Sequence, residues 1–481
     1  MLFNSLDYLL FLPLVVGLYY SLPIRFRWIL LLAASYYFYM CWKAEYIILI
    51  FLSTLVDYHI ARQIFSEAKK TTKQILLGIS LSVNLGVLIA FKYYNFFSHN
   101  INEVLSTVNV LGRLPYYDLL LPVGISFYTF QTLSYTIDVY HGRIQPQNHF
   151  GKFAVFVSFF PQLVAGPIER ASHLIPQLDK KVEFSYRNAV SGLRRILWGM
   201  FKKVVVADRL AIIVDHVYGS HEEQTGFSLL IASYLFAFQI YCDFSGYSDI
   251  AIGSARLLGI DLMENFRRPY FSRSISEFWS RWHISLSTWF RDYVYIPLGG
   301  NRVSMRRVYI NILIVFLVSG LWHGANWTFV VWGALHGVYL IFERVLKNKV
   351  RFNNSLFVQS VQILICFHLV VFGWIFFRSE SVEQSISIIA SIFDVEQWRV
   401  SFSYFEQLKI HKPVVTIPKF LTTLCMLTLL IIGDMILSYL KLKKAFFALS
   451  RPYRWGVYII VILLIVLVGN HGESEFIYFQ F

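Results

Sequence analysis

The sequence predicts an all-α, polytopic membrane protein that forms a single transmembrane domain over residues 1–481. Apolar residue types make up 56% of the chain and charged types only 15%, against about 25% charged residues in an average soluble domain. Many stretches long enough to cross a bilayer carry no charged residue. Aromatic residues, at 18%, suit a protein anchored at two membrane interfaces. This composition excludes a water-soluble enzyme, a disordered chain and a free nucleic-acid binder, and it makes membrane lipid the first predicted partner.

The lengths of the uncharged stretches predict the membrane elements. A helix needs about 20 residues to span the hydrocarbon core, and shorter segments suffice where they are buried or the bilayer thins. The uncharged stretches are residues 8–24, 74–91, 119–137, 153–168, 224–242, 308–342, 352–377 and 455–472. Shorter or once-interrupted candidates are residues 28–42, 46–56 and 420–440. We therefore expect roughly eleven transmembrane or re-entrant helices, with amphipathic helices at the interface.

One uncharged stretch, residues 308–342, is too long for a single crossing. As one straight helix it would measure about 52 Å, because an α-helix rises about 1.5 Å per residue. Gly320, Gly324 and Asn326 mark the expected break. An irregular backbone at membrane depth persists only where protein or a water-filled cavity covers its polar groups. The break therefore predicts a functional feature inside the membrane.

Basic residues indicate which connections face the cytoplasm. Arg25 and Arg27 follow the first element, and further basic residues between positions 62 and 73 follow the third, which predicts an outward-facing N-terminus. Residues 194–209 are also basic, and residues 256–307 carry nine Lys or Arg against four acidic residues. We expect both segments on the cytoplasmic side, where they suit an anionic leaflet and an anionic substrate.

Residues 271–298 predict an amphipathic helix that lies in or near the membrane interface. Ser274 and Glu277 fit a capping box at its start. At helical spacing, one narrow apolar stripe contains Trp279, Trp282, Leu286, Trp289 and Tyr293. Residues 379–419 are the most soluble-looking part of the chain, and we expect them to form an extramembrane or surface-lying loop.

His323 is the first candidate catalytic residue, because an ionisable side chain inside a membrane segment is by default a functional-site hypothesis. It lies in the sequence SGLWHGANW, residues 319–327, where the flanking glycines allow the helix to unwind and present the ring to a cavity. A buried imidazole without metal ligands suits a general base, which removes the proton of a hydroxyl as its oxygen attacks an acyl carbon.

Three other histidines need weighing. His283 lies at the edge of the aromatic stripe, and a structural and a functional role are equally open for it. His336 and His368 lie in apolar stretches, and for both we favour a hydrogen bond to a neighbouring helix.

Other chemistry has less support in the sequence. No G-x-S-x-G, P-loop, HExxH or GxGxxG motif is present, which leaves acyl transfer or proton-coupled transport. The four cysteines are far apart, so we predict neither a metal site nor a bound cofactor. In IPLGGNR, residues 296–302, adjacent glycines beside Arg302 could hold phosphate oxygens, although a helix-ending turn in a basic loop explains the same residues.

Several long stretches resemble the membrane-bound O-acyltransferase family, specifically its bacterial branch that O-acetylates exported polysaccharides such as alginate, cellulose or peptidoglycan. They are residues 121–140, 159–170, 201–208, 241–260, 265–302 and 319–337, together with MLFNS at the start and FIYFQF at 476–481. The resemblance covers most of the chain, and the two blocks around His283 and His323 are highly specific as a pair.

The resemblance implies an O-acyltransferase of the bacterial cytoplasmic membrane. Its acyl donor is expected to be cytoplasmic, acetyl-CoA or an acyl carrier, and its hydroxyl acceptor is expected to be reached through a channel at the thinnest point of the protein. His323 matches the family's catalytic histidine, and His283 its second site histidine, which orients or polarises. The acceptor is expected to be an extracytoplasmic polysaccharide, or a hydroxyl on an esterase-like periplasmic partner protein that then modifies the polymer.

Two further hypotheses follow from the position of the histidines. Asn326, Trp327 and Ser285 are candidates for binding the substrate, since they lie within about a turn of His323 or His283. The alternative from another class is a proton-coupled transporter or flippase of a polysaccharide export system, in which both histidines and Asp243 or Asp249 relay protons. Transporters more often show broken helices in two matching halves, and we see one such break.

Overall fold

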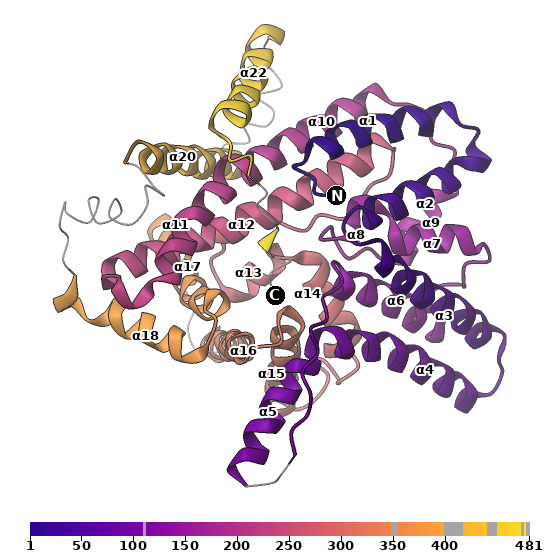
Figure 1. Cartoon of the computed structure of the whole chain (residues 1–481), viewed down its shortest axis with the longest axis horizontal. Helices are drawn as coiled ribbons and strands as arrows, with labels where there is room; N and C mark the ends of the chain where they lie inside the picture. The colour runs from indigo at the N-terminus through magenta and orange to yellow at the C-terminus, as the bar shows by residue number, and fades with distance from the viewer. Residues whose placement is uncertain (109–111, 348–354, 399–416, 440–449, 473–475, 478–481) are drawn as a thin grey trace.

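The computed structural model describes residues 1–108, 112–347, 355–398, 417–439, 450–472 and 476–477. All regular secondary structure in these residues is helical, which confirms the predicted all-α fold (Figure 1). Among them, 7 helices are long and apolar enough to cross a membrane, and α1 (Leu6–Ser21) and α18 (Val382–Phe393) are shorter apolar helices. The chain is therefore a multi-pass membrane protein.

The first part of the chain forms a group of neighbouring helices at one side of the molecule (Figure 1). They are α2 (Ile24–Met40), α3 (Ile47–Ser66), α4 (Lys70–Leu88), α6 (Ile125–Tyr140), α7 (Phe150–Ser158), α8 (Phe160–Leu163) and α9 (Ala171–Leu178). A π-helical turn, η2 (Ile89–Tyr93), joins α4 to α5 (Tyr94–Thr107), which projects from the bottom of the view in Figure 1. The stretch 153–168 divides into α7 and α8, because Phe159 is not helical and Pro161 stands at the start of the next helix.

Two long helices at the centre pack through glycine. α10 (Tyr186–Met200) is followed by the π-helical η3 (Phe201–Ala207) and α11 (Asp208–Gly219), and α12 (Gly226–Leu257) runs back across them. A Cβ atom on Gly199 would lie 2.6 Å from the carbonyl oxygen of Gly246, and one on Gly192 would lie 2.7 Å from that of Gly253. Small residues at such a crossing let two membrane helices approach at backbone distance. This crossing sets the spacing of the polar side chains that α10 and α12 carry.

The predicted break in residues 308–342 is confirmed. α15 (Met305–His323) ends at His323 and α16 (Trp327–Lys347) starts after a short connection. Asn326 opens α16, because its Oδ1 accepts a hydrogen bond from the Thr328 amide at 3.0 Å. Gly320 stays helical, and a Cβ there would lie 2.2 Å from the Phe329 carbonyl oxygen, so this glycine serves the close packing of α15 on α16.

The prediction of one continuous helix over residues 271–298 is wrong. The start is as expected, since the Glu277 amide donates to Ser274 Oγ at 3.2 Å. The segment then divides into α13 (Ile275–Arg281), α14 (Ile284–Phe290) and the π-helical η6 (Arg291–Tyr295), with His283 in the left-handed region at a φ of 42°. The break is held by residues 265–267, where Arg267 N donates to Arg281 O at 2.9 Å and Asn265 O accepts from Ile284 N at 3.0 Å.

The last helices complete the described fold. α17 (Leu356–Arg378) packs on α16 and α12, and α18 and the 3-10 turn η7 (Val395–Gln397) form where we expected a loop over 379–419. Residues 399–416 of that prediction lie outside the described residues. α20 (Ile417–Tyr439) and α22 (Arg451–Val468) follow, and α22 projects away from the body of the molecule (Figure 1).

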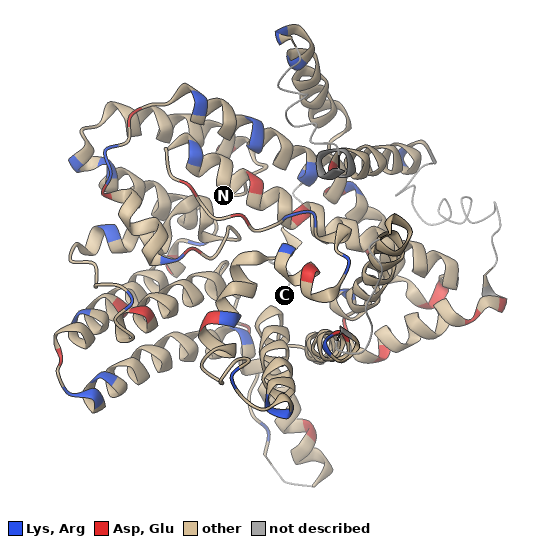
Figure 2. Ribbon diagram, turned by 180° about the vertical axis from the view of Figure 1, so that it is seen from behind, with Lys and Arg blue, Asp and Glu red and all other residues tan. Residues whose placement is uncertain are grey.

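Figure 2 shows the long helices uncharged over much of their length, with Lys and Arg gathered near helix ends and in connections.

The glycine crossing of α10 and α12 generates a stability prediction. We expect Gly199→Ala to cost about 1–3 kcal/mol, because the added methyl must push two backbones apart. The measurement is the thermal unfolding midpoint of the purified protein in detergent. Gly78→Ala in α4 is the matched control, since a Cβ there meets nothing within 4 Å. An equal midpoint for both variants would contradict the close approach.

Candidate active site

His323 ends α15 inside the protein and is only 3% exposed. Its ring packs against those of Trp322, Trp332 and Phe377, with centroid distances of 4.9, 5.0 and 5.3 Å. It lines a cavity of about 40 Å³, which is room for about one water molecule. We call this the inner cavity; it is also lined by Lys92, Leu121, Pro122, Val123, Gly124, Ile125, Ser126, Phe127, Val164 and Trp322.

His283 stands at the break between α13 and α14 and is fully buried. Asn265 fixes the residues that follow it, because Asn265 Oδ1 accepts from Ser285 Oγ at 2.9 Å and from Ser285 N at 3.2 Å. Burial lowers the pKa of the His283 imidazole to about 3. The ring is therefore neutral at physiological pH, as an imidazole that accepts a proton must be.

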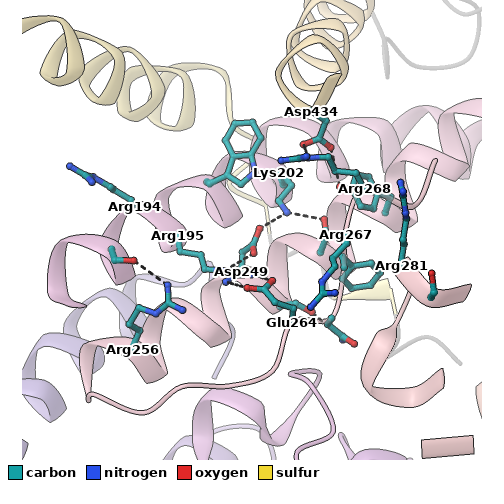
Figure 3. A pocket seen from close by; sticks show the side chains of 18 of the residues that line it. Arg194, Arg195, Lys202, Asp249, Arg256, Glu264, Arg267, Arg268, Arg281 and Asp434 are labelled. Atoms are coloured by element: carbon teal, nitrogen blue, oxygen red, sulfur yellow. Dashed lines mark hydrogen bonds and ion pairs between the residues drawn. The ribbon is translucent and has the colours of Figure 1, made fainter. Parts of the chain in front are cut away.

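A second, larger cavity has a volume of about 960 Å³ and is strongly polar (Figure 3). We call it the basic pocket. Its wall contains seven basic and four acidic residues: Arg194, Arg195, Lys202, Arg256, Arg267, Arg268 and Arg281, with Asp249, Glu264, Glu277 and Asp434. The two basic segments that the sequence predicted to face the cytoplasm, 194–209 and 256–307, thus meet in one pocket. An excess of positive charge in a concave site attracts anions.

Ion pairs fix part of the pocket wall. Arg195 Nε donates to Asp249 Oδ1 at 2.8 Å, and its two terminal nitrogens donate to the carboxylate of Glu264, each at 2.6 Å (Figure 3). Lys202 Nζ donates to the other oxygen of Asp249 at 2.5 Å. A bidentate guanidinium–carboxylate pair is geometrically specific as well as strong. These contacts tie α10 and η3 to α12 and to the segment that holds the His283 break.

A thin layer of rings separates the two cavities. Phe266, in the wall of the basic pocket, has its ring centroid 6.5 Å from that of His283. On the other side, His283 lies 6.2 Å from Phe127 and 6.0 Å from Trp322, and both of these residues line the inner cavity. His283 therefore stands within the partition, and His323 stands on its far face.

The other predicted site residues lie elsewhere. Ser285 is beside His283 but buried, Asn326 caps α16, and Trp327 donates from Nε1 to Asn100 Oδ1 at 2.8 Å. None of the three is among the residues that line the inner cavity or the basic pocket. Arg302 is exposed and precedes α15, whereas His323 ends it, so the two lie at opposite ends of that 19-residue helix. The roles of these four residues in substrate binding stay predictions.

The remaining histidines behave differently from one another. His336 is buried and accepts a hydrogen bond at Nδ1 from Trp279 Nε1 at 3.3 Å, which agrees with the favoured structural interpretation. His368 is exposed, and its Nδ1 lies 2.7 Å from the carbonyl oxygen of Leu364 in the same helix, so the expected bond to a neighbouring helix is wrong there.

Asp243, proposed as a proton relay in the transporter alternative, lies in a buried cluster that also contacts residues 476–477. Lys203 Nζ lies 2.6 Å from Asp243 Oδ1 and 2.8 Å from Asp208 Oδ1. Asp243 Oδ2 accepts a hydrogen bond from the Ile477 amide at 2.7 Å, and the Phe476 ring packs on Tyr247 with a centroid distance of 4.8 Å.

Sequence reasoning missed Lys92, which lines the inner cavity beside His323. Its signal was available, since it is a lysine directly after the uncharged stretch 74–91. It also missed Asn265, for which the sequence carries no signal, because its role depends on a contact with Ser285, 20 residues away.

Within the described residues, no three His, Cys, Asp or Glu side chains gather as metal ligands.

The fold and the site define a multi-pass helical membrane protein with two histidines at the boundary between a basic pocket and a small inner cavity. The chain belongs to the membrane-bound O-acyltransferase (MBOAT) family, whose model matches residues 147–382. It is 40% identical to the probable alginate O-acetylase AlgI of Pseudomonas aeruginosa over 457 residues, which are 94% of this chain and 82% of that protein.

Two other relatives extend the range of acyl acceptors. The chain is 36% identical to the peptidoglycan O-acetyltransferase of Helicobacter pylori over 385 residues, covering 75% of this chain and 72% of that protein. It is 29% identical to the teichoic acid D-alanyltransferase of Bacillus subtilis over 283 residues, covering 55% and 71%. The chain is therefore a membrane O-acyltransferase, and the transporter alternative has no support among these relatives.

The ion pairs of the basic pocket generate a second stability prediction. We expect Asp249→Asn to lower stability by about 3 kcal/mol, because it leaves the charges of Arg195 and Lys202 without their shared carboxylate in a mostly buried site. Asp261→Asn is the matched control, since the Asp261 side chain is 70% exposed in its pair with Arg256. Its effect should stay within about 1 kcal/mol. Unfolding midpoints in detergent that rank in the opposite order would contradict the assigned role of Asp249.

Proposed function

We propose that this protein moves an acetyl group from a cytoplasmic thioester to a hydroxyl on the outer side of the bacterial cytoplasmic membrane, with His323 as the general base. The observation that carries the proposal is the partition between the two cavities. There the ring of His283 lies between that of Phe266, in the wall of the basic pocket, and that of Trp322, in the wall of the inner cavity, which His323 also lines. A donor and an acceptor that approach from opposite sides would be closest there.

The basic pocket suits the acyl donor. Acetyl-CoA and acyl carriers both present phosphate groups next to a long pantetheine arm, and guanidinium groups are the preferred phosphate ligands of proteins. A volume of about 960 Å³ is in the range of sites for cofactor-sized ligands. Arg267 is exposed at this pocket, and among the described residues no ion pair involves its side chain. It is therefore the arginine best suited to a phosphate.

The chemistry assigned to His323 is a single transfer. Its imidazole takes the proton of the acceptor hydroxyl while the oxygen attacks the thioester carbonyl carbon. The new C–O bond forms, the C–S bond breaks, and the proton passes from the imidazole to the departing thiolate, which leaves as the free thiol. His283, neutral and 6.0 Å from Trp322 between centroids, is suited to orient the thioester or polarise its carbonyl as it crosses the partition.

The direction of transfer rests on the course of α15. This helix begins beside the basic residues Arg306 and Arg307, on the side predicted to be cytoplasmic, and ends at His323. A helix of 19 residues is about 28 Å long, close to the thickness of the hydrocarbon core. The inner cavity is thus assigned to the outer half of the membrane, and the basic pocket to the cytoplasmic half.

The acceptor follows from the relatives. Their names include alginate and peptidoglycan, which are polymers with free hydroxyl groups outside the cytoplasmic membrane. We propose an exported polysaccharide as the final acceptor, reached directly or through a hydroxyl on an esterase-like periplasmic partner.

The first functional prediction concerns the base. In membranes that contain the full-length protein and its polymer, His323→Ala should lower transfer of radiolabel from acetyl-CoA to alkali-labile ester by at least about 100-fold, the share that a general base contributes. His368→Ala is the matched control, because this histidine is exposed and hydrogen-bonded within its own helix. A wild-type rate for the His323 variant would refute the proposal.

The second functional prediction concerns the donor. Arg267→Gln should raise KM for acetyl-CoA about tenfold and leave kcat unchanged, since it removes a charge-assisted contact that is equal in ground state and transition state. Arg187→Gln is the control, because Arg187 is exposed on α10 and does not line the pocket. An unchanged KM in the Arg267 variant would place the donor elsewhere.

A further inference from the structure

The end of α15 poses a hydrogen-bonding problem inside the protein. The last carbonyl groups of an α-helix have no partner within the helix. The Gly320 carbonyl accepts from Gly324 N at 3.4 Å. The next three carbonyls, those of Leu321, Trp322 and His323, face the protein interior, where an unpaired backbone group is costly.

All three carbonyls are satisfied by two consecutive side chains from a distant part of the sequence. Lys92 Nζ donates to Trp322 O and to His323 O, both at 2.9 Å. Tyr93 Oη donates to Leu321 O at 2.6 Å. Lys92 and Tyr93 belong to η2, the π-helical turn between α4 and α5. Single π-helical turns inside a long helix are frequent at functional sites.

Lys92 is an ionisable residue inside an apolar helix. A lysine at such a depth is costly and marks a functional site by default. Among the described residues, no ion pair to a carboxylate includes Lys92, and the negative end of the α15 dipole, presented by the two carbonyls, offsets its charge. Lys92 also lines the inner cavity together with His323. Lys92 is thus in direct contact with the backbone of His323, the residue that the proposed function uses as general base.

We propose that Lys92 is a positioning residue for His323. It acts through the backbone, because it holds the carbonyl of His323 itself and that of the preceding residue at the point where the chain leaves the helix. Gly324, the next residue, is extended and places no side chain against this turn. Without the two hydrogen bonds the last turn frays, and the imidazole loses its fixed place beside Trp322. This inference rests on the proposed function of His323.

The test compares four variants of the full-length protein in membranes, with radiolabelled acetyl-CoA as the probe. Lys92→Met keeps the length of the side chain and removes its donors, and should lower kcat about 100-fold, the cost of misplacing a catalytic group by about 1 Å. KM for acetyl-CoA should stay within about twofold, because the basic pocket is intact. Lys92→Arg, which keeps charge and donors, should recover at least about a tenth of the wild-type kcat.

Two controls complete the design. Lys73→Met makes the same chemical change on α4, away from both cavities, and should leave kcat and KM unchanged. His323→Ala reports on the proposed function itself. If His323→Ala retains the wild-type rate, the function proposed for His323 fails, and the role of Lys92 fails with it.

Three results overturn the inference while leaving the proposed function in place. The first is a Lys92→Met variant with kcat within about threefold of wild type while His323→Ala is inactive. The second is a rise of KM without a fall of kcat, which would make Lys92 a binding group for the donor. The third is loss of activity in both Lys92 variants together with a collapse of the unfolding midpoint in detergent, which would make its role purely structural.

Discussion

The candidate active site depends on how the protein satisfies backbone groups where helices stop inside it. Both histidines stand at such points, His323 where α15 ends and His283 just before α14 begins. At the end of α15, side chains donate hydrogen bonds to the carbonyl groups that the helix leaves unpaired. At the start of α14, Asn265 accepts hydrogen bonds from the unpaired amides. Buried backbone groups without partners would cost several kcal/mol each in an apolar interior. The polar partners therefore permit the two interruptions that bring the imidazoles to the partition.

The basic pocket has a wall that is fixed by ion pairs and that still carries more basic than acidic side chains. Arg195 and Lys202 share Asp249, and their pairs connect α10, η3 and α12. The same two long helices approach through glycine, so that their polar side chains reach each other across a short distance. Seven basic side chains against four acidic ones leave an excess of positive charge in the wall. The residues that line the basic pocket thus both fix its shape through ion pairs and supply the positive charge that attracts an anion.

Part of this arrangement was predictable from the sequence, and the physical reasons for success and failure differ. The break at His323 could be predicted because an uncharged stretch of that length exceeds the membrane thickness and contains Gly324 and Asn326. The break at His283 could not, since the helical periodicity of residues 271–298 continues through it and a separate segment at Asn265 imposes the interruption. The distance of Arg302 from His323 follows from α15, whose 19 residues lie between Ser304 and Gly324. The pairing of Lys92 with Trp322 spans 230 residues and leaves no local pattern.

The buried position of Phe476 and Ile477 has a consequence for folding. These residues contact Tyr247 and Asp243, which stand near the middle of α12, and they are at most 4% exposed. The hydrogen bond between Asp243 and Ile477 joins residues 234 positions apart, and closing so long a loop costs chain entropy. The helices around Asp243 therefore cannot complete their packing with their sequence neighbours alone. Their interior is filled only when a distant segment returns to it.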